Sequence, residues 1–312
     1  MRALVTGAAG FVGQHLINHL QGSGDNVLAT VGAGQRCASA VAIAELDITD
    51  YQSCVKIVSK FEPEVIYHLA GISFVPEAEN NFDIALKVNV AGTQNLVRAA
   101  HLLDKKVKFL FASSAEVYGK LQGHEIPVSE SQPARPANNY SLSKYMAELV
   151  VSRYANVGTI VPLIMRPFNH IGAGQHANFV APSFARQLAK IKLNKARPVI
   201  TVGNLTPQRD FSDVRDIARA YRLAATKGDG VYNLGVGKPI AIQEILDLLL
   251  EISQVKVKVE QDPNLMRPAE VPVLYADISK AKRELDWSPE YSLKSSLQEV
   301  FVDAINAESS DA

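Results

Sequence analysis

Short apolar runs alternate with amphipathic segments along the first half of the chain. The runs lack the strict polar alternation of half-exposed strands, which is typical of strands buried on both faces of a parallel sheet. The segments between them repeat apolar residues every three or four positions, as helices do. The expected strands are residues 3–5, 27–31, 65–69, 107–112 and 160–165, and the expected helices are 12–20, 51–61, 84–103 and 140–156. Together they predict an α/β fold with a doubly wound, parallel Rossmann sheet.

The pattern changes after residue 165. The segment 166–213 is rich in Pro, Gly and Asn, with an apolar helix expected at about 179–191. Further helices are expected at 217–225, 242–252 and 279–285, a short strand at 231–234, and a frayed tail from Ala307. We therefore expect residues 1–165, with a return at about 210–236, to form the Rossmann domain. Residues 166–209 and 237–312 would form a smaller C-terminal lobe.

The charge balance narrows the possible partners. Lys and Arg together number 32, as do Asp and Glu, so the net charge is zero. A general nucleic-acid or membrane-surface binder would need a basic excess. Cys37 and Cys54 lie in different expected elements, which indicates a reduced setting and no metal site. With no signal-peptide pattern and no apolar run near the ~20 residues of a membrane span, the sequence predicts a cytoplasmic protein.

A glycine-rich turn directly follows the first expected strand. Gly7, Gly10 and Gly13 have the spacing G-x-x-G-x-x-G and open a helix that begins near Phe11 and Val12. Such glycines allow a tight turn and a close approach to a pyrophosphate, which the helix N-terminus attracts. A plain glycine-rich turn is the alternative. The position between a strand and an amphipathic helix favours a dinucleotide site, so the Rossmann domain is predicted to bind NAD(P).

The choice between the two nicotinamide cofactors depends on the end of the second strand. NAD sites usually have an acid there for the ribose 2′-hydroxyl, and the run ending at Val31 has none. Arg36 follows and could meet a 2′-phosphate, or could be a solvated loop residue. Asp47 and Ile48 are candidate adenine contacts, although Asp47 could equally cap a helix. The sequence therefore favours NADP(H) over NAD(H).

Tyr140 and Lys144 are separated by one helical turn and follow a serine pair at a strand end. Either Ser113 or Ser114 could face the site, and Ser114 is preferred. A free tyrosine, with a pKa of ~10, is a poor base at neutral pH. A nearby ammonium and a hydroxyl donor would stabilise its phenolate and lower that pKa. Tyr140 could then exchange a proton with a carbonyl or alcohol while a nicotinamide exchanges hydride; a surface helix is the alternative.

These motifs together resemble the extended short-chain dehydrogenase/reductase superfamily over nearly the whole chain. The matching segments are 6–13, 68–71, 89–93, 113–114, 140–144 and 209–211. Members act on nucleotide-activated sugars, and segments 74–78, 166–175, 179–180 and 267–272 resemble enzymes of GDP-deoxyhexose synthesis. Two departures are Ala173, where proline is usual, and Gly71, where alanine is usual. The resemblance implies reduction of the 4-keto group of GDP-4-keto-6-deoxy-D-mannose to GDP-D-rhamnose, by a homodimer.

The resemblance also implies roles for single residues. It places Leu69, Ala70, Gly71, Pro167, Tyr140 and Lys144 against the cofactor, and it gives Asn89 a supporting role for the active-site helix. The implied substrate contacts are Asn169, Asn178, Arg186, Arg209, Arg267 and Glu270. Arginine suits a diphosphate because its planar fork binds two oxygens at once. A solvated helix face is the alternative for Arg186.

Glu116 leaves the reaction open. In the related 4,6-dehydratases a glutamate at this position removes a proton and assists loss of the 6-hydroxyl, which needs a carboxyl acid/base. A reductase needs only hydride and the tyrosine proton, although an acid here also fits reductases. A GDP-mannose 4,6-dehydratase or another nucleotide-sugar epimerase/dehydratase therefore remains the alternative. A non-catalytic cofactor-binding protein is a second one, which the intact Ser114, Tyr140 and Lys144 argue against.

Overall fold

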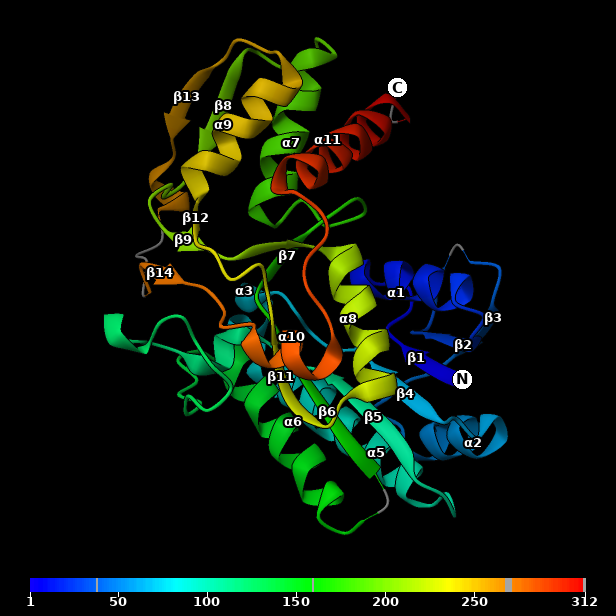
Figure 1. Ribbon diagram of the computed structural model, residues 1–312. Coiled ribbons are helices and arrows are strands. Elements are labelled where there is room, and N and C mark those ends of the chain that lie inside the picture. Colours follow the sequence, from blue (N-terminus) through cyan, green and yellow to red (C-terminus); the bar gives the residue numbers. More distant parts are fainter. Residues whose placement is uncertain (38, 159, 267–270, 311–312) are drawn as a thin grey trace.

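The computed structural model describes residues 1–37, 39–158, 160–266 and 271–310. Within these residues the main sheet has seven strands, and every neighbouring pair is parallel. From one edge to the other the strands are β11 (Gly230–Leu234), β6 (Ile160–Pro167), β5 (Val107–Ala112), β4 (Val65–His68), β1 (Arg2–Thr6), β2 (Asn26–Val31) and β3 (Ala42–Glu45). This order confirms the predicted doubly wound Rossmann sheet (Figure 1).

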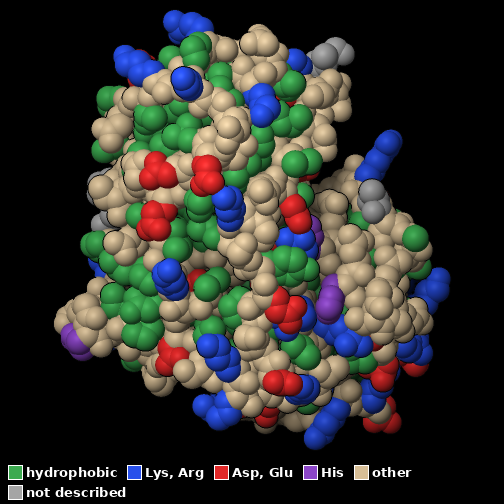
Figure 2. Space-filling view, turned by 45° about the horizontal axis from the view of Figure 1, so that its top comes forward, with side chains coloured by type: hydrophobic (Ala, Val, Ile, Leu, Met, Phe, Trp, Pro, Cys, Tyr) green, Lys and Arg blue, Asp and Glu red, His purple; other side chains and the backbone are tan. Residues whose placement is uncertain are grey.

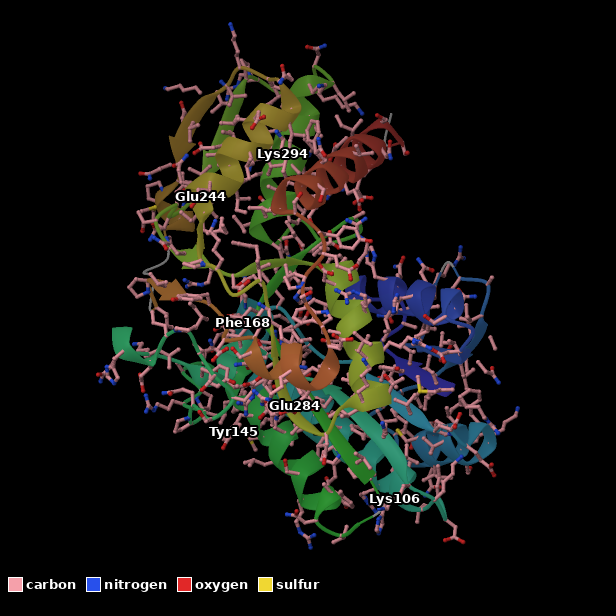
Figure 3. The ribbon with its side chains drawn as sticks, in the orientation of Figure 1. Lys106, Tyr145, Phe168, Glu244, Glu284 and Lys294 are labelled. Atoms are coloured by element: carbon pink, nitrogen blue, oxygen red, sulfur yellow. The ribbon has the colours of Figure 1, made fainter. Side chains whose placement is uncertain are left out.

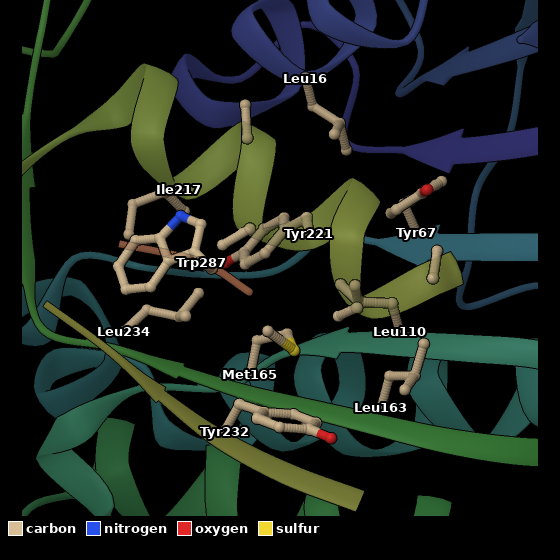
Figure 4. Close-up of a cluster of buried hydrophobic side chains, with 14 of the residues drawn as sticks. Leu16, Tyr67, Leu110, Leu163, Met165, Ile217, Tyr221, Tyr232, Leu234 and Trp287 are labelled. Atoms are coloured by element: carbon tan, nitrogen blue, oxygen red, sulfur yellow. The ribbon is translucent and has the colours of Figure 1, made fainter. Parts of the chain in front are cut away.

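Helices cover both faces of this sheet. One face packs against α1 (Phe11–Gly22), α8 (Val214–Lys227) and α10 (Ser279–Leu285). The other face packs against α2 (Tyr51–Phe61), α5 (Thr93–His101) and α6 (Asn139–Ala155). Figure 4 shows the first core, in which Leu16 and Tyr221 lie over Leu110 and Met165. Because both faces are buried, the strands need no polar alternation.

A third hydrophobic core lies in the upper lobe of Figure 1. Three helices form it, α7 (Val180–Lys192), α9 (Ile242–Ser253) and α11 (Leu293–Ser310). Short strands complete the lobe and join it to the sheet domain. They are β7 (Asn169–Ile171), β8 (Val199–Val202), β9 (Gln208–Arg209), β10 (Phe211–Asp213), β12 (Ile240–Ala241), β13 (Lys258–Gln261) and β14 (Val273–Leu274). In Figure 3, Phe168 lies where the two lobes join, with Glu244 above it and Tyr145 below it.

The expected helix at 84–103 contains an irregularity. It starts at α4 (Phe82–Ala85), continues through a π-helical segment, η1 (Leu86–Gly92), and ends with α5. Such π segments are often found at functional sites. The remaining short helices are α3 (Val75–Asn80), η2 (Ala115–Tyr118), η3 (Gly123–Glu125) and η4 (Pro263–Leu265).

Two expectations about the C-terminal region were wrong. The sequence reading contained no helix at α11, although Leu297, Val300, Phe301 and Ala304 are buried at helical spacing. The tail was expected to fray from Ala307, whereas α11 continues to Ser310. The physical reason is anchoring, because ion pairs from Arg186 and Lys190 to Glu308 hold the last turn against α7.

Glu308 is the anchor of that last turn. Its carboxylate lies 3.1 Å from Arg186 Nε and 3.8 Å from Lys190 Nζ, and it is itself buried. Lys195 also donates to the backbone carbonyl of Glu308.

Charges of both signs are interspersed on the face shown in Figure 2.

None of the helices that the structure describes is long and apolar enough to cross a lipid bilayer. In the described ranges, no group of three or more His, Cys, Asp or Glu side chains could hold a metal ion.

Candidate active site

The expected site residues follow four neighbouring strands at one edge of the sheet. The register aligns Thr6 with His68, His68 with Phe111, and Ala112 with Met165. The loops after β1, β4, β5 and β6 therefore leave the sheet side by side. Ligands of doubly wound proteins bind at this carboxyl edge.

The glycine turn has the geometry that a dinucleotide needs. Gly7 has φ +71°, and a Cβ there would lie 2.6 Å from the amide nitrogen of Ala70. A Cβ on Gly13 would lie 2.4 Å from the carbonyl oxygen of Gly7, so any larger residue would push α1 off the sheet. Gly10 precedes α1 with no side-chain cap, and the first turn of α1, which begins with Phe11 and Val12, contains no acid. The positive helix end is thus open to an anionic group, and these residues fit a pyrophosphate.

A buried hydrogen-bond chain joins this turn to the π-helical segment. Thr93 Oγ1 donates to the carbonyl oxygen of Asn89 at 2.6 Å, so it accepts from His68 Nε2 at 2.9 Å. With its proton on Nε2, His68 accepts at Nδ1 from Thr6 Oγ1 (2.8 Å), which in turn accepts from the amide of Ala70 (3.3 Å). Burial lowers the pKa of His68 to about 3, so the ring is neutral.

Asn89 supports the active-site helix through its side chain. Its Oδ1 accepts from the amide of Ile72 at 2.8 Å, and its Nδ2 donates to Ser143 Oγ at 2.9 Å. Ser143 Oγ donates to the carbonyl oxygen of Tyr140 at 2.7 Å. The departure at Gly71 has a local reason, because a Cβ there would lie 2.8 Å from Asn89 Oδ1.

The structure separates the roles of the two serines. The buried Ser113 donates its hydroxyl to Glu148 on α6. Ser114 is only partly buried, its hydroxyl hydrogen-bonds to Tyr140, and it accepts from the amide of Glu116 at 3.2 Å. Ser114 is therefore the serine of the candidate site, as preferred from the sequence.

Tyr140 and Lys144 lie buried on one face of α6. The predicted lowering of the tyrosine pKa was wrong: burial raises the pKa of Tyr140 to about 12, aided by Glu116 and opposed by the Ser114 hydrogen bond. Burial lowers the pKa of Lys144 to about 8, opposed by Glu148. At neutral pH the phenol is a proton donor and the lysine is mainly an ammonium.

Glu116 interacts electrostatically with Arg209 of the upper lobe. Glu116 is exposed, and its charge acts on both Tyr140 and Arg209. Arg209 is half-buried in β9 and donates to the carbonyl oxygen of Gln208 at 2.8 Å. Burial lowers the pKa of Arg209 while Glu116 raises it. The charge of Glu116 thus links the phenol of Tyr140 to the guanidinium of Arg209.

The residues expected to contact the adenine half lie around the end of β2. Arg36 is exposed in the loop between β2 and β3, with no acid at the end of β2 itself. Asp47 is exposed and accepts from the amide of Thr49 at 2.8 Å, while Ile48 is buried. The helix cap proposed as an alternative for Asp47 is instead Asp50, which accepts from Gln52 and Ser53.

Residues expected to bind substrate are brought together only in part. Asn169, in β7, and Asn178, just before α7, are exposed. Phe74 and Phe179 pack edge to face with ring centroids 6.0 Å apart, which joins the two segments expected to recognise a GDP-sugar. Arg186 instead lies on the face of α7 that pairs with Glu308, an interaction for which the sequence gave no signal. Arg267 and Glu270 lie outside the described residues.

Leu69, Ala70 and Pro167 were expected to contact the cofactor, and this stays a prediction. The first two follow β4, and Pro167 ends β6. The segment after Pro167 is fixed to the cofactor turn, because Phe11 stacks on His170 with centroids 5.9 Å apart. His15 Nε2 donates to the carbonyl oxygen of Ala173 at 2.9 Å. These two histidine contacts were not predicted.

The protein-family model described as GDP-mannose 4,6 dehydratase matches residues 4–300. The chain belongs to this family. Its relatives include a GDP-6-deoxy-D-mannose reductase of Pseudomonas aeruginosa, 33% identical over 97% of this chain and 96% of the relative. A GDP-6-deoxy-D-talose 4-dehydrogenase of Aggregatibacter actinomycetemcomitans is 33% identical over 90% of each chain.

Among solved structures, RMD from Pseudomonas aeruginosa complexed with NADPH is similar throughout. It superposes with a TM-score of 0.86 at 31% identity, over 98% of this chain and all of the other. Family membership and the matching fold confirm the extended short-chain dehydrogenase/reductase resemblance.

Proposed function

We propose that this protein uses a reduced nicotinamide cofactor to convert GDP-4-keto-6-deoxy-D-mannose to GDP-D-rhamnose. The observation that carries the proposal is the hydrogen-bonded Ser114–Tyr140 pair beside Lys144. It is supported by relatives of full length that are named as a GDP-sugar reductase and a GDP-sugar dehydrogenase. An NAD(P)-dependent oxidoreductase acting on a nucleotide sugar accounts for both.

The side chains of the site would act on the 4-keto oxygen. When bound, the reduced cofactor supplies hydride to the carbonyl carbon. Tyr140 holds its proton at neutral pH, because its pKa is about 12, and donates it to the oxygen as negative charge develops. Ser114 donates a hydrogen bond to the same oxygen. The ammonium of Lys144 stabilises the phenolate that remains.

We assign the cofactor to the carboxyl edge of the sheet. The turn of Gly7, Gly10 and Gly13 and the start of α1 would hold the pyrophosphate. Leu69, Ala70, Gly71 and Pro167 would contact the nicotinamide half, and Asp47 and Ile48 the adenine half. Arg36, exposed after an acid-free strand end, favours NADP(H) over NAD(H).

We assign the sugar nucleotide to the space between the lobes. Arg209 is the arginine that we assign to the diphosphate, and its guanidinium interacts with Glu116. Asn169 and Asn178 present exposed amides from the upper lobe. Arg267 and Glu270 remain predicted contacts from the sequence. Arg186 would take part only after leaving Glu308.

A 4,6-dehydratase is the second candidate function. Glu116 favours it, because an exposed carboxylate whose charge reaches Tyr140 could serve as an acid/base. The two reactions differ in their use of cofactor. A reductase consumes reduced cofactor stoichiometrically, whereas a dehydratase ends with its cofactor unchanged.

The domain division, assembly and location remain predictions. We retain a cofactor domain of residues 1–165 with a return at about 210–236, and a sugar-nucleotide lobe formed by the rest. Exposed Ile84, Leu142, Met146 and Leu149 lie on the adjacent helices α4 and α6 and could support a homodimer. Light scattering would measure the dimer, and fractionation of the source cell would test the cytoplasmic location.

The proposed activity is tested with a panel of nucleotide-linked 4-ketosugars. NADPH absorbance is followed with each substrate, and the product sugar is identified. We expect one NADPH consumed per GDP-4-keto-6-deoxy-D-mannose, with no consumption in the Tyr140→Phe variant. Loss of water from GDP-mannose with no net cofactor change would instead support the dehydratase.

A further inference from the structure

A buried polar network lies directly behind the candidate site. Glu148 accepts from Arg166 Nε at 2.9 Å and from a terminal guanidinium nitrogen at 2.6 Å, and it also accepts from Ser113. All three side chains are buried. Such a carboxylate–guanidinium pair is costly to bury, and loss of either partner would leave an uncompensated charge. Because the pair lies next to the reacting groups, we looked for a role in the reaction as well as in stability.

The network attaches β5 to α6 at two points. Ser114 binds Tyr140, while the preceding residue, Ser113, binds Glu148 two helical turns further along the same helix. Two turns correspond to roughly 12 Å along the axis. One attachment would allow α6 to pivot about Ser114, whereas two fix both its rotation and its translation against the strand end.

Arg166 extends the attachment to the neighbouring strands. It is the penultimate residue of β6, and the residue before it, Met165, accepts from the amide of Ser113 at 2.8 Å. Its guanidinium lies 4.9 Å from the ring centre of Tyr118. Tyr118 donates to Asn233 of β11 at 2.7 Å. The network therefore joins α6 to three adjacent strands of the sheet.

The same carboxylate faces the catalytic lysine. Tyr140, Lys144 and Glu148 follow one another at intervals of four residues, so they share one face of α6. Two neutral groups also lie near Lys144, namely His68 of β4 and the Phe111 ring of β5, whose centre is 4.8 Å from Nζ. The cation on the far side of Glu148 is Arg166, whose guanidinium lies 2.6 Å from the Glu148 carboxylate. Glu148 is thus the anion placed to keep Lys144 an ammonium, and its loss would leave Arg166 and Lys144 as neighbouring cations.

We propose that Ser113, Glu148 and Arg166 form a positioning unit, which holds the Ser114 hydroxyl against Tyr140 and supplies the counter-charge of Lys144. None of the three touches the reacting atoms; they act through Ser114, Tyr140 and Lys144. The proposal rests on the proposed reductase function for its kinetic test.

Two variants separate the positional and electrostatic roles. Ser113→Ala removes one hydrogen bond and no charge, so kcat should fall roughly tenfold with KM for the sugar nucleotide and the pH profile unchanged. Glu148→Gln removes the counter-charge. Lys144 should then lose its proton at lower pH, so the alkaline limb of kcat/KM should move to lower pH.

Ser296→Ala is the matched control. Ser296 is buried and donates to Asp213 at 2.6 Å, and Arg215 binds Asp213 with two nitrogens, at 2.9 and 2.7 Å. Like Ser113→Ala, this control removes a serine hydrogen bond to a carboxylate that is paired with an arginine. The pair of the control lies outside the candidate site. We expect it to lower Tm about as much as Ser113→Ala while leaving kcat and the pH profile unchanged.

Hydrogen exchange of the wild type and variants gives a readout that needs no turnover. Ser113→Ala should speed exchange in peptides covering residues 113–118 and 140–150, and Ser296→Ala should not. If the wild type reduces no 4-ketosugar, the proposed function fails. The exchange rates of the Ser113→Ala and Ser296→Ala proteins still test the positioning role in that case. A Ser113→Ala protein with faster unfolding but wild-type kcat and unchanged local exchange would overturn the proposal. So would a folded Glu148→Gln protein with an unmoved alkaline limb.

Discussion

The hydroxyl groups of Ser114 and Tyr140 are joined by a hydrogen bond, although 25 positions of the sequence and a loop separate the two residues. Ser114 caps the short helix after β5, and Tyr140 lies in the first turn of α6. The pairing puts a hydroxyl donor and a buried, protonated phenol at one point. This is the arrangement required to donate a proton and a hydrogen bond to one carbonyl oxygen.

Tyr140→Phe should therefore abolish turnover while leaving cofactor binding near normal. Only the phenol oxygen transfers the proton, and general acid catalysis typically contributes ~100- to 10,000-fold. Steady-state kinetics and a fluorescence titration with NADPH measure the two effects. Lys144→Ala is the comparison, because it should damage both. A Tyr140→Phe enzyme with most of its kcat would refute the assignment.

NADPH should bind at least as well as NADH. The end of β2 has no acid to repel a 2′-phosphate, and Arg36 is exposed beyond it. Titration with both cofactors measures the preference. The Arg36→Ala substitution should weaken the binding of NADPH more than the binding of NADH. If NADH binds clearly better to the wild type, our interpretation of the β2 loop is wrong.

Arg209→Ala should raise KM for the sugar nucleotide far more than it changes cofactor affinity. Truncating one partner of a buried charge pair typically costs ~2–5 kcal/mol, and Arg209 is half-buried. Arg186→Ala is the structural comparison, because Arg186 pairs with Glu308. It should lower Tm with little change in KM. Normal substrate binding by Arg209→Ala would place the diphosphate elsewhere.

Glu116→Gln separates the two candidate reactions. In a reductase no C5 proton is removed, so the variant should keep substantial activity on a GDP-4-keto-6-deoxy sugar. In a dehydratase it should lose most of the conversion of GDP-mannose, by ~100- to 10,000-fold. Both reactions can be followed by product analysis, with wild-type protein and NADP as the reference.

Acid should destabilise the protein partly through His68. Its pKa is lowered to about 3 in the folded state, against about 6.5 when exposed. Between these values the unfolded chain binds more protons, so stability should fall as pH drops from about 6.5 towards 3. Urea unfolding at pH 7 and pH 4.5 measures the loss. The His68→Gln variant should be less stable than the wild type at pH 7, and its stability should fall less between pH 7 and pH 4.5. An equal fall in both proteins would show that His68 does not cause the acid sensitivity.

The sequence predicted most of the sheet and the central site, because both depend on short-range patterns. The glycine spacing and the Tyr140–Lys144 interval are local geometry, and the structure has them as expected. The choice between Ser113 and Ser114 could not be made locally, because both hydroxyls contact α6 and only the fold shows which of them meets Tyr140. Arg186 was ambiguous for a similar reason, since its partner Glu308 is distant in sequence.

Two other features required knowledge of burial. The pKa of Tyr140 depends mainly on how completely its phenol is buried, whereas the ammonium and the hydroxyl donor expected from the sequence could only suggest a lower value. Glu148 carried a usable signal, because it continues the four-residue interval of Tyr140 and Lys144. The spacing alone could not show that Glu148 is buried in an ion pair, because its partner, Arg166, comes from β6.

The position of β11 has a consequence for synthesis on the ribosome. β6 ends at Pro167, yet its outer neighbour in the sheet, β11, begins only at Gly230. At ~5–20 residues per second, several seconds separate the two strands during translation. Through that interval the hydrogen-bonding edge of β6 has no partner strand, and an open edge is a template for pairing with other chains. The nascent protein should therefore depend most on chaperones after β6 emerges and before β11 does.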